Sequence, residues 1–466
     1  MTVGRWAYYA TPMKLSKLSR ITAVMAGFII LLAVGCSSGP PPEPEPTVDP
    51  RQEIVFHNGV ILTMDEDNPQ AQALAVRGEK ITAAGDEEAV LAEAGGEATR
   101  IDLQGATLMP GFVDAHTHLL NVAERYFDMS LPEVQQLALE NGITTIGDLY
   151  VDSRFLKEIQ AFEPALRLRT SLYLVMTDNC GKPTGDWYKE YPPTRNPGEM
   201  LRTGGVKIFS DGGTCKKPAL SYELTPGEGL GDLSLEQEEL NAMVREAQEA
   251  GYQVAIHAIG DRAVEQAQNA IALALDGQPN SYRHRIEHNS VIRPELLPRY
   301  GEVGIVPVLF GDYPICEPFG PPPPEAYQAW EWPWRALLDA NPGLPVAWHS
   351  DDPFFGRVRL LDDLYSLVTR NEVGKDGRLC EAPSWQKQHT ITAVEALHMM
   401  TTGAAYALFR DEEVGRLVPG YYADLIILSD NPLTINPKSI PEMNVWMTMA
   451  GGLTAHCAPG QESLCP

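Results

Sequence analysis

The sequence predicts an α/β fold, a (β/α)8 TIM barrel joined to a small β domain that is built from both chain ends. Eight short apolar segments recur between residues 111 and 349, and helical patterns lie between several of them. Strands that alternate with helices favour a parallel sheet, and eight such strands favour a closed barrel. Both ends of the chain after residue 50 are instead rich in β-forming residues. An open doubly wound sheet is the alternative for the central part.

Two clear helical signals lie between the candidate barrel strands. Residues 234–247 repeat apolar residues at helical spacing and open with Ser234, which forms a capping box with Gln237. Residues 263–275 form a second helical pattern that ends before Gly277. The eight predicted strands are residues 111–116, 143–148, 168–175, 206–209, 253–257, 285–288, 304–309 and 345–349.

Turn signals flanked by strand-forming residues mark both chain ends. Asn58-Gly59 lies inside segment 54–64 and Gly78 inside segment 73–83, so each segment is predicted to form a hairpin. Segments 99–103, 423–428 and 445–455 are also β-rich. We expect one β domain from residues 51–107 and 412–456, a barrel from residues 108–411, and a tail over residues 457–466.

The N-terminus has the pattern of an export signal. Lys14, Lys17 and Arg20 precede an apolar run over residues 21–35, which is too short to span a bilayer as a helix. The run ends in Leu32-Ala-Val-Gly-Cys36, which resembles a bacterial lipobox and implies a signal peptide over residues 1–36 and lipidation of Cys36. The proline-rich residues 37–50 suit a tether. We expect an exported, lipid-anchored protein of the bacterial cell envelope, with the domain in the periplasm or outside the cell. Ordinary secretion with a free Cys36 is the alternative.

The net charge and the cysteine content limit which binding partners and which cellular compartment are expected. The net charge of −26 argues against binding to nucleic acid, because such a surface repels phosphate. The expected partner is a small-molecule substrate. Six cysteines follow Cys36 and none forms a CxxC pair, so a structural zinc site is not expected. Disulfides are favoured over free buried thiols, with Cys457–Cys465 as the local pair that closes a short loop.

Polar residues at the ends of apolar strands predict a metal centre. His116-Thr-His118 ends the first barrel strand, and residues two apart on a strand point to the same side. Barrel enzymes place their active sites at the carboxyl ends of the strands. Burying so many polar groups would be costly unless they share a metal. The other candidate ligands stand in or just after predicted strands: Lys207, His257, His288 and Asp351, with Asp352 as the competitor of Asp351.

With these residues in place, the chain resembles the amidohydrolase superfamily, specifically the N-substituted formamide deformylase-like branch known as amidohydrolase family 3. The resemblance covers nearly all of residues 52–455 and implies a barrel with a β-sandwich domain made of both ends. It is carried by the motifs at residues 111–118, 205–212, 255–262, 285–289 and 350–353, and by the later segments 391–397 and 415–426.

The resemblance also implies the roles of the site residues. His116, His118 and Asp351 would bind one metal ion, His257 and His288 a second, and a carboxylated Lys207 would bridge the two. Zinc is the expected ion for imidazole and carboxylate ligands. Asp351 would also be the catalytic acid and base in the hydrolysis of amide-type C–N bonds. If Lys207 is instead an ion-pair partner or a surface residue, the site holds one ion.

Several features leave alternatives open. His349 stands where the family usually has glycine, so it could touch the site or pack in the core. Asp148 could support a metal ligand from outside the site, and Trp330, Trp332 and Trp334 could form an apolar wall over the substrate or pack helices.

A lactonase, a mononuclear deaminase and a non-catalytic metal-binding lipoprotein are the rival functions. Gly260 argues against a deaminase, because such enzymes place a general-acid glutamate at this position.

Overall fold

Eight parallel strands form the centre of the computed structural model, which describes residues 48–466 except residues 214, 312–313, 319 and 356. The predicted signal peptide and Cys36 lie outside the described residues. The strands follow one another around a single sheet in sequence order. They are β8 (Phe112–Thr117), β9 (Ile143–Val151), β10 (Arg169–Val175), β11 (Leu201–Phe209), β12 (Gln253–Ala258), β13 (Arg285–His288), β14 (Val306–Phe310) and β15 (Ala347–His349).

The last and first strands nearly close this sheet into a barrel. Just beyond β15, the Asp351 N–H donates to the His116 carbonyl at 3.1 Å, and the His118 N–H donates to the Asp352 carbonyl at 2.8 Å. These two bonds connect the carboxyl ends of β8 and β15. The barrel is therefore confirmed, and the open doubly wound sheet is wrong for this chain.

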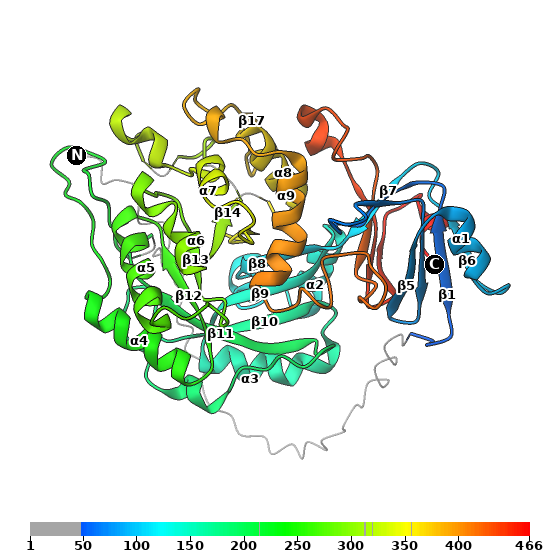
Figure 1. Cartoon of the computed structure of the whole chain (residues 1–466), viewed down its shortest axis with the longest axis horizontal. Coiled ribbons are helices and arrows are strands. Elements are labelled where there is room, and N and C mark those ends of the chain that lie inside the picture. Colours follow the sequence, from blue (N-terminus) through cyan, green and yellow to red (C-terminus); the bar gives the residue numbers. More distant parts are fainter. Residues whose placement is uncertain (1–47, 214, 312–313, 319, 356) are drawn as a thin grey trace, which may run out of the picture.

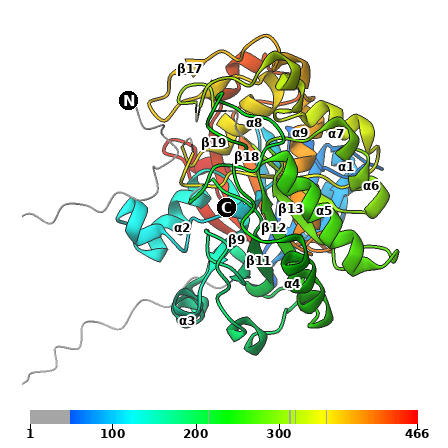
Figure 2. The ribbon, with the colours of Figure 1, turned by 90° about the vertical axis from the view of Figure 1, so that its left-hand side faces the viewer.

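Helices on the outside bury the apolar strands from solvent, as Figures 1 and 2 show. The predicted helix over residues 263–275 is confirmed as part of α5. The other helical prediction is right in place but wrong in its start, because α4 begins at Gln237 and its capping box pairs Glu236 with Glu239. The helices of this layer are α2 (Leu131–Glu140), α3 (Ser153–Phe162), α4 (Gln237–Glu249), α5 (Asp261–Leu275), α6 (Arg299–Val303), α7 (Trp334–Ala340), α8 (Leu360–Thr369) and α9 (Ala393–His398). Helix α10 (Ala404–Ala407) instead closes the amino end of the barrel, where its alanines share a core with residues of the strands.

Both chain ends combine into a β-sandwich beside the barrel, where Figure 1 shows the blue and red segments side by side. One sheet has the order β5-β4-β1-β6 and the other the order β20-β19-β18-β7-β2-β3. Phe56 and Leu74 from the first sheet share a buried core with Leu108, Leu425 and Met447 from the second. The strands are β1 (Glu53–His57), β2 (Val60–Leu62), β3 (Gln70–Ala71), β4 (Ala73–Arg77), β5 (Lys80–Gly85), β6 (Thr99–Asp102), β7 (Thr107–Pro110), β18 (Leu425–Leu428), β19 (Val445–Ala450) and β20 (Leu453–Cys457). Helix α1 (Glu87–Glu93) packs on the outer face of the first sheet through Val90.

The two turn signals near the N-terminus have different outcomes. Gly78, at a φ of 56°, joins β4 and β5 in the predicted hairpin. The hairpin predicted at Asn58-Gly59 is wrong, because β1 and β2 on either side of it belong to different sheets. A Cβ on Gly59 would lie 2.6 Å from the Ala106 carbonyl oxygen, so glycine lets the chain cross between the sheets at close range.

Three disulfides connect the six described cysteines. Cys457–Cys465 confirms the predicted local pair, and Cys180–Cys215 and Cys316–Cys380 connect loops at the carboxyl ends of the barrel strands. A second antiparallel pair, β16 (Glu372–Val373) with β17 (Leu379–Cys380), carries one partner of the last disulfide. Among the described residues, helices with the length and apolar character needed to cross a membrane are absent.

Candidate metal centre

Three of the predicted ligands already form a tight triangle. The Nε2 atoms of His116 and His118 are 3.4 Å apart, and each lies 3.3 Å from Oδ1 of Asp351. Ligand atoms bound about 2.0–2.1 Å from one tetrahedral zinc ion lie about 3.3–3.4 Å from each other. The side chains present therefore fit a divalent metal ion, and Asp351 rather than Asp352 faces the two imidazoles.

Buried histidines extend this triangle into a larger group. Ligand atoms of His116, His288, His349 and Asp351 all lie within 4.8 Å of one another. None of these four residues is more than 8% exposed. Burial holds the pKa of His116 and of His288 well below the ordinary value, with the Lys207 charge among the further causes, so both imidazoles are neutral and able to bind a cation. A buried site of three histidines and one aspartate suits a divalent metal.

The remaining predicted ligands lie on β11, β12 and β13, across the barrel from β8. The rings of His257 and His288 are 4.5 Å apart between centroids, and Lys207 is 1% exposed. Among the described residues, Lys207 Nζ has no hydrogen-bond partner, and Phe209 lies under it with the ring centroid at 5.0 Å. Burial lowers the pKa of Lys207 to about 8, although Glu287 and Asp351 favour its charged form. A buried ammonium without a hydrogen bond is costly, so this lysine is poised for a chemical role.

Buried carboxylates and amides hold the first two imidazoles in position. Glu287 Oε2 lies 2.9 Å from Nδ1 of His116, and Arg285 donates to both oxygens of Glu287 at 2.6 and 2.7 Å. This bond keeps the proton on Nδ1, which leaves Nε2 of His116 free to bind metal. Asn121 Nδ2 lies 3.2 Å from Nδ1 of His118 and 2.5 Å from Asp148, so the predicted support from Asp148 reaches the ligand through Asn121.

A left-handed turn of the backbone places the ligands that follow strand ends. Asp351 has a φ of 59°, and His288 has a φ of 70°. Side chains other than glycine rarely adopt this conformation, and such strain is concentrated at functional sites. Ser350 anchors the turn by donating from its hydroxyl to Asp114 at 2.5 Å and from its N–H at 3.2 Å. Burial raises the pKa of Asp114 to about 7 despite these bonds.

His349 belongs to the site rather than to a separate core. Its ring stacks on His116 with centroids 4.6 Å apart and planes 16° from parallel, and the centroid of His288 is 4.9 Å away. Sequence reasoning treated core packing as an equal possibility. It gave Glu287, Asn121 and Asp114 no role, although Glu287 and Asp114 are charged residues within apolar strands, the same signal that identified Lys207.

A large cavity opens from the metal ligands to the surface between the loops. Its volume is about 790 Å³. Trp332 lines it, whereas Trp330 packs behind the wall on Tyr327 at 4.8 Å, and Trp334 is buried in α7 beneath Arg370. The expected wall of three tryptophans is therefore wrong for Trp334, which packs a helix.

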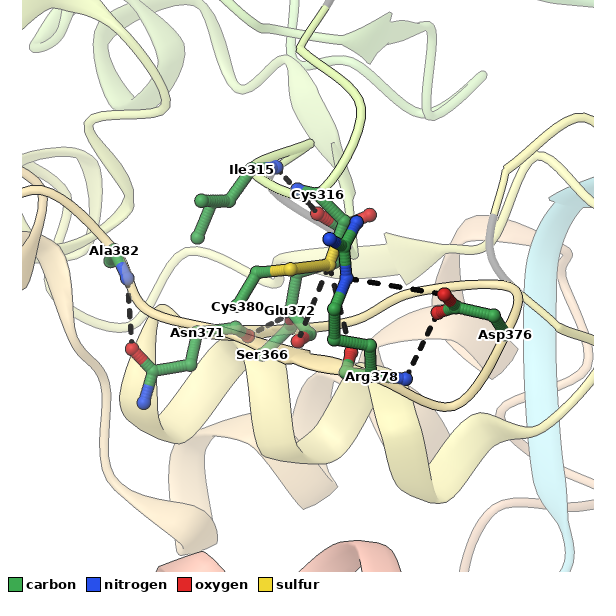
Figure 3. The surroundings of a disulfide bond; sticks show 9 residues. All are labelled: Ile315, Cys316, Ser366, Asn371, Glu372, Asp376, Arg378, Cys380 and Ala382. Atoms are coloured by element: carbon green, nitrogen blue, oxygen red, sulfur yellow. Dashed lines mark hydrogen bonds and ion pairs between the residues drawn. A yellow bond between two sulfur atoms is a disulfide. The ribbon is translucent and has the colours of Figure 1, made fainter.

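The mouth of the cavity is fastened by the Cys316–Cys380 disulfide, which Figure 3 shows. Glu372 accepts hydrogen bonds from the N–H groups of Ile315 and Cys316. Arg378 and Glu372 line the cavity together with Cys316. The loop after β14 and the β16–β17 pair are thus held as one rim.

Comparison with protein families places the chain among known sequences. A model described as the amidohydrolase family matches residues 99–148 and 135–456, well over half of the chain. YtcJ of Bacillus subtilis is 28% identical over 265 residues, which make up 55% of this chain and 47% of that protein. The N-substituted formamide deformylase of Arthrobacter pascens is 38% identical over 266 residues, 54% of this chain and 46% of that enzyme. The chain thus spans about half the length of these relatives.

Solved structures agree with the fold. A crystal structure of an uncharacterized metal-dependent hydrolase from Pyrococcus furiosus superposes with a TM-score of 0.65 at 20% sequence identity. The match covers 82% of this chain and all of the other. At this identity the likeness establishes the barrel with its added β domain, and the chemistry has to be inferred from the side chains.

Proposed function

Because the chain belongs to amidohydrolase family 3, we propose that it hydrolyses an amide-type C–N bond, in an N-formyl compound, an amide or a cyclic amide. The observation that carries the proposal is the triangle of His116, His118 and Asp351 atoms beside Lys207, whose Nζ has no hydrogen-bond partner in the described part of the chain. This arrangement supports a hydrolase that uses divalent metal. The choice of bond is supported by the 38% identity to an enzyme named for formamide deformylation.

We propose that the site holds two metal ions and that both are zinc. His116, His118 and Asp351 would hold the first and His257 and His288 the second. Lys207 would bridge them as an N6-carboxylated side chain, because a carbamate offers two oxygens where an ammonium offers no lone pair. Such ions supply a Lewis acid for the substrate carbonyl and make hydroxide available near neutral pH.

The protein's own groups carry the proton. Asp351 accepts the proton of the attacking water and donates it to the nitrogen that leaves as an amine. Glu287 keeps the His116 ring oriented while this happens, because its carboxylate fixes the proton on Nδ1.

The deaminase alternative conflicts with the space around Gly260. A Cβ at this position would lie 2.1 Å from the carbonyl oxygen of Ala219, so a glutamate could not stand there without moving backbone. A lactonase uses the same ligands, and the substrate screen described below separates it from an amidase.

Export is the second part of the proposal. All six described cysteines are in disulfides, which persist in oxidising compartments and are rare in the bacterial cytosol. Together with the lipobox-like end at Cys36, this supports a lipid-anchored protein of the cell envelope. The mass of the N-terminal peptide of the mature protein tests it, and an unmodified Cys36 would leave ordinary secretion.

Metal analysis coupled to a substrate screen tests the hydrolase. Purified protein loaded with zinc is assayed against formamides, amides, lactams and lactones, with Asp351→Asn protein as the control for contaminating activity. We expect bound metal and turnover of at least one C–N substrate that the variant lacks. Bound metal without turnover would favour the non-catalytic lipoprotein, and turnover of lactones alone would favour the lactonase.

A further inference from the structure

The cavity above the metal ligands is large for the smallest substrates of the proposed chemistry. Its volume of about 790 Å³ is in the upper part of the range of about 300–1,000 Å³ for small-molecule sites. His116, Lys207, His257 and Asp351 lie at its floor. A formyl group on a small amine would leave most of this space empty, so the side chains that line the rest bear on the substrate.

One side of the cavity is a rigid apolar surface, here called the inner wall, made by Leu220, Tyr222, Leu224 and Val291. Tyr222 stacks on Tyr327 with ring centroids 4.2 Å apart and planes 6° from parallel. Trp330 packs edge-on against Tyr222 at 5.9 Å. These contacts fix the inner wall before any ligand binds.

A second apolar surface, here called the outer wall, is made by Tyr126, Phe310, Phe354 and Phe355. Phe354 lies 5.1 Å from His118 between ring centroids and contacts Tyr126 edge-on at 5.5 Å. Phe310 packs against Phe355 at 4.8 Å and against His349 at 5.4 Å. The outer wall therefore begins directly at the metal ligands.

The order of strands puts most of the inner wall across the site from most of the outer wall. Leu220, Tyr222 and Leu224 of the inner wall follow β11, whereas Tyr126, Phe354 and Phe355 of the outer wall follow β8 and β15. Val291 after β13 and Phe310 at the end of β14 come from neighbouring strands, where the two walls approach each other. In a ring that runs from β8 to β15, β11 and β12 lie across from the junction of β8 with β15. A carbonyl at the metal ligands would thus have one apolar wall on either side.

The cations near the cavity do not build a pocket for a substrate carboxylate. Arg125, Arg154 and Arg378 are exposed, and the last two face Glu158 and Asp376 at 3.9 and 4.0 Å. Lys375, also exposed, donates to the Phe354 carbonyl at 3.2 Å. Exposed and partly paired cations of this kind contribute little fixed affinity.

From these observations we infer that the substrate is an amide with a bulky apolar group, such as an aromatic ring, on both the acyl side and the nitrogen side of the scissile bond. The inference rests on the proposed function, because it places the scissile carbonyl at the metal ligands. Each wall is a separate subsite that holds one of the two groups.

Binding of hydroxamates by the zinc-loaded protein tests the two subsites without turnover. The four probes are acetohydroxamate, its N-benzyl derivative, phenylacetohydroxamate, and N-benzyl-phenylacetohydroxamate, which all chelate metal through the same group. Calorimetry should show that each phenyl group tightens binding by about tenfold to hundredfold, and that the two gains multiply. Succinohydroxamate, with a carboxylate in place of the phenyl group, should gain nothing.

Variants assign the gains to the walls. Tyr222→Ala should remove the gain from one phenyl group and Phe354→Ala the gain from the other, while Tyr191→Ala, an aromatic residue outside the cavity lining, should remove neither. Absence of a gain on either side in the unmodified protein overturns the inference, whether or not the variants fold. Full gains with no turnover in the amide screen would refute the proposed hydrolysis and leave the two apolar subsites in place.

Discussion

The two halves of the candidate metal centre differ in how far the protein has assembled them. In the first half, His116, His118 and Asp351 hold three ligand atoms at the spacing of one coordination sphere. In the second half, His257 donates toward the Gly212 carbonyl, with Nε2 at 3.2 Å, and Lys207 Nζ has no hydrogen-bond partner among the described residues.

The difference follows from what supports each half. Backbone bonds between the ends of β8 and β15 and the Glu287 carboxylate fix the first half without an ion. The second half contains an amine that repels a cation until it is chemically changed, because carboxylation converts a positive charge to a negative one. Metal loading should therefore be sequential, with the first half filled before the second.

Asp351→Asn breaks the first half and should have the largest effect. The amide keeps the size of the side chain but removes the charged ligand and the proton acceptor, so kcat/KM should fall by about 10³-fold or more. Turnover of the best substrate from the screen and metal content per chain are measured together. The control is Asp352→Asn, whose carboxylate does not face His116 or His118. Equal losses in the two variants would contradict the assignment of Asp351.

Lys207→Ala breaks the second half alone. We expect the zinc content to fall from two ions per chain to one or none, because the proposed bridge between the halves is the carboxylated side chain of Lys207. Lys207→Met, which fills the space with an apolar chain, separates this effect from packing and should lose the same ion. Unchanged stoichiometry in both variants would refute the bridge, and more stable protein with unchanged metal would identify Lys207 as a costly buried charge.

Glu287→Gln weakens the support of the first half without touching a ligand atom. Metal affinity should fall by about 10–100-fold, because an uncharged acceptor holds the His116 proton less firmly. Since the change also disturbs the ion pair with Arg285, Asp424→Asn is the matched control: Asp424 is buried and accepts from Arg169 at 2.6 Å within another buried ion pair. Competition with a zinc-binding dye measures both affinities. A similar loss in the control would reduce Glu287 to a stabilising residue.

The unequal assembly also explains what the sequence could and could not predict. The barrel strands were predictable because apolar runs alternate with helical patterns. The pairing of His116 with His118 was predictable because side chains two residues apart on a strand point to the same side. The positions of Asp351 and His288 depend on left-handed backbone at the strand ends, which periodicity does not encode. The wrong hairpin at Asn58-Gly59 has a similar cause, because a local turn signal does not say which sheet receives the next strand.

His349 shows the limit of reasoning from resemblance. The resemblance implied glycine at this position and therefore gave no role for a histidine. In the folded chain the side chain stacks on His116 because β15 ends beside β8. For Glu287 the sequence did contain a signal, but not the partner. Its charge within an apolar strand was visible, but its partner at Nδ1 of His116 lies 171 residues away and could be identified only in the folded chain.

The smallest expected effect is that of changing His284. This histidine comes just before the strand whose last residue is the candidate ligand His288, so it compares a structural histidine with a metal-binding one. It accepts from the Val254 N–H at Nδ1 and faces Gln248 at Nε2, both at 3.0 Å, so the protein satisfies it fully. His284→Ala should lower the free energy of unfolding by about 2–4 kcal/mol and leave the zinc content unchanged.

Burial lowers the pKa of His284 to about 3, so the unfolded chain binds the extra proton between pH 6.5 and 3. The advantage of wild type over the variant should therefore shrink as the pH falls through this range, as urea unfolding at several pH values would measure. A loss of zinc in His284→Ala would mean that the amino end of the barrel supports the metal centre as well.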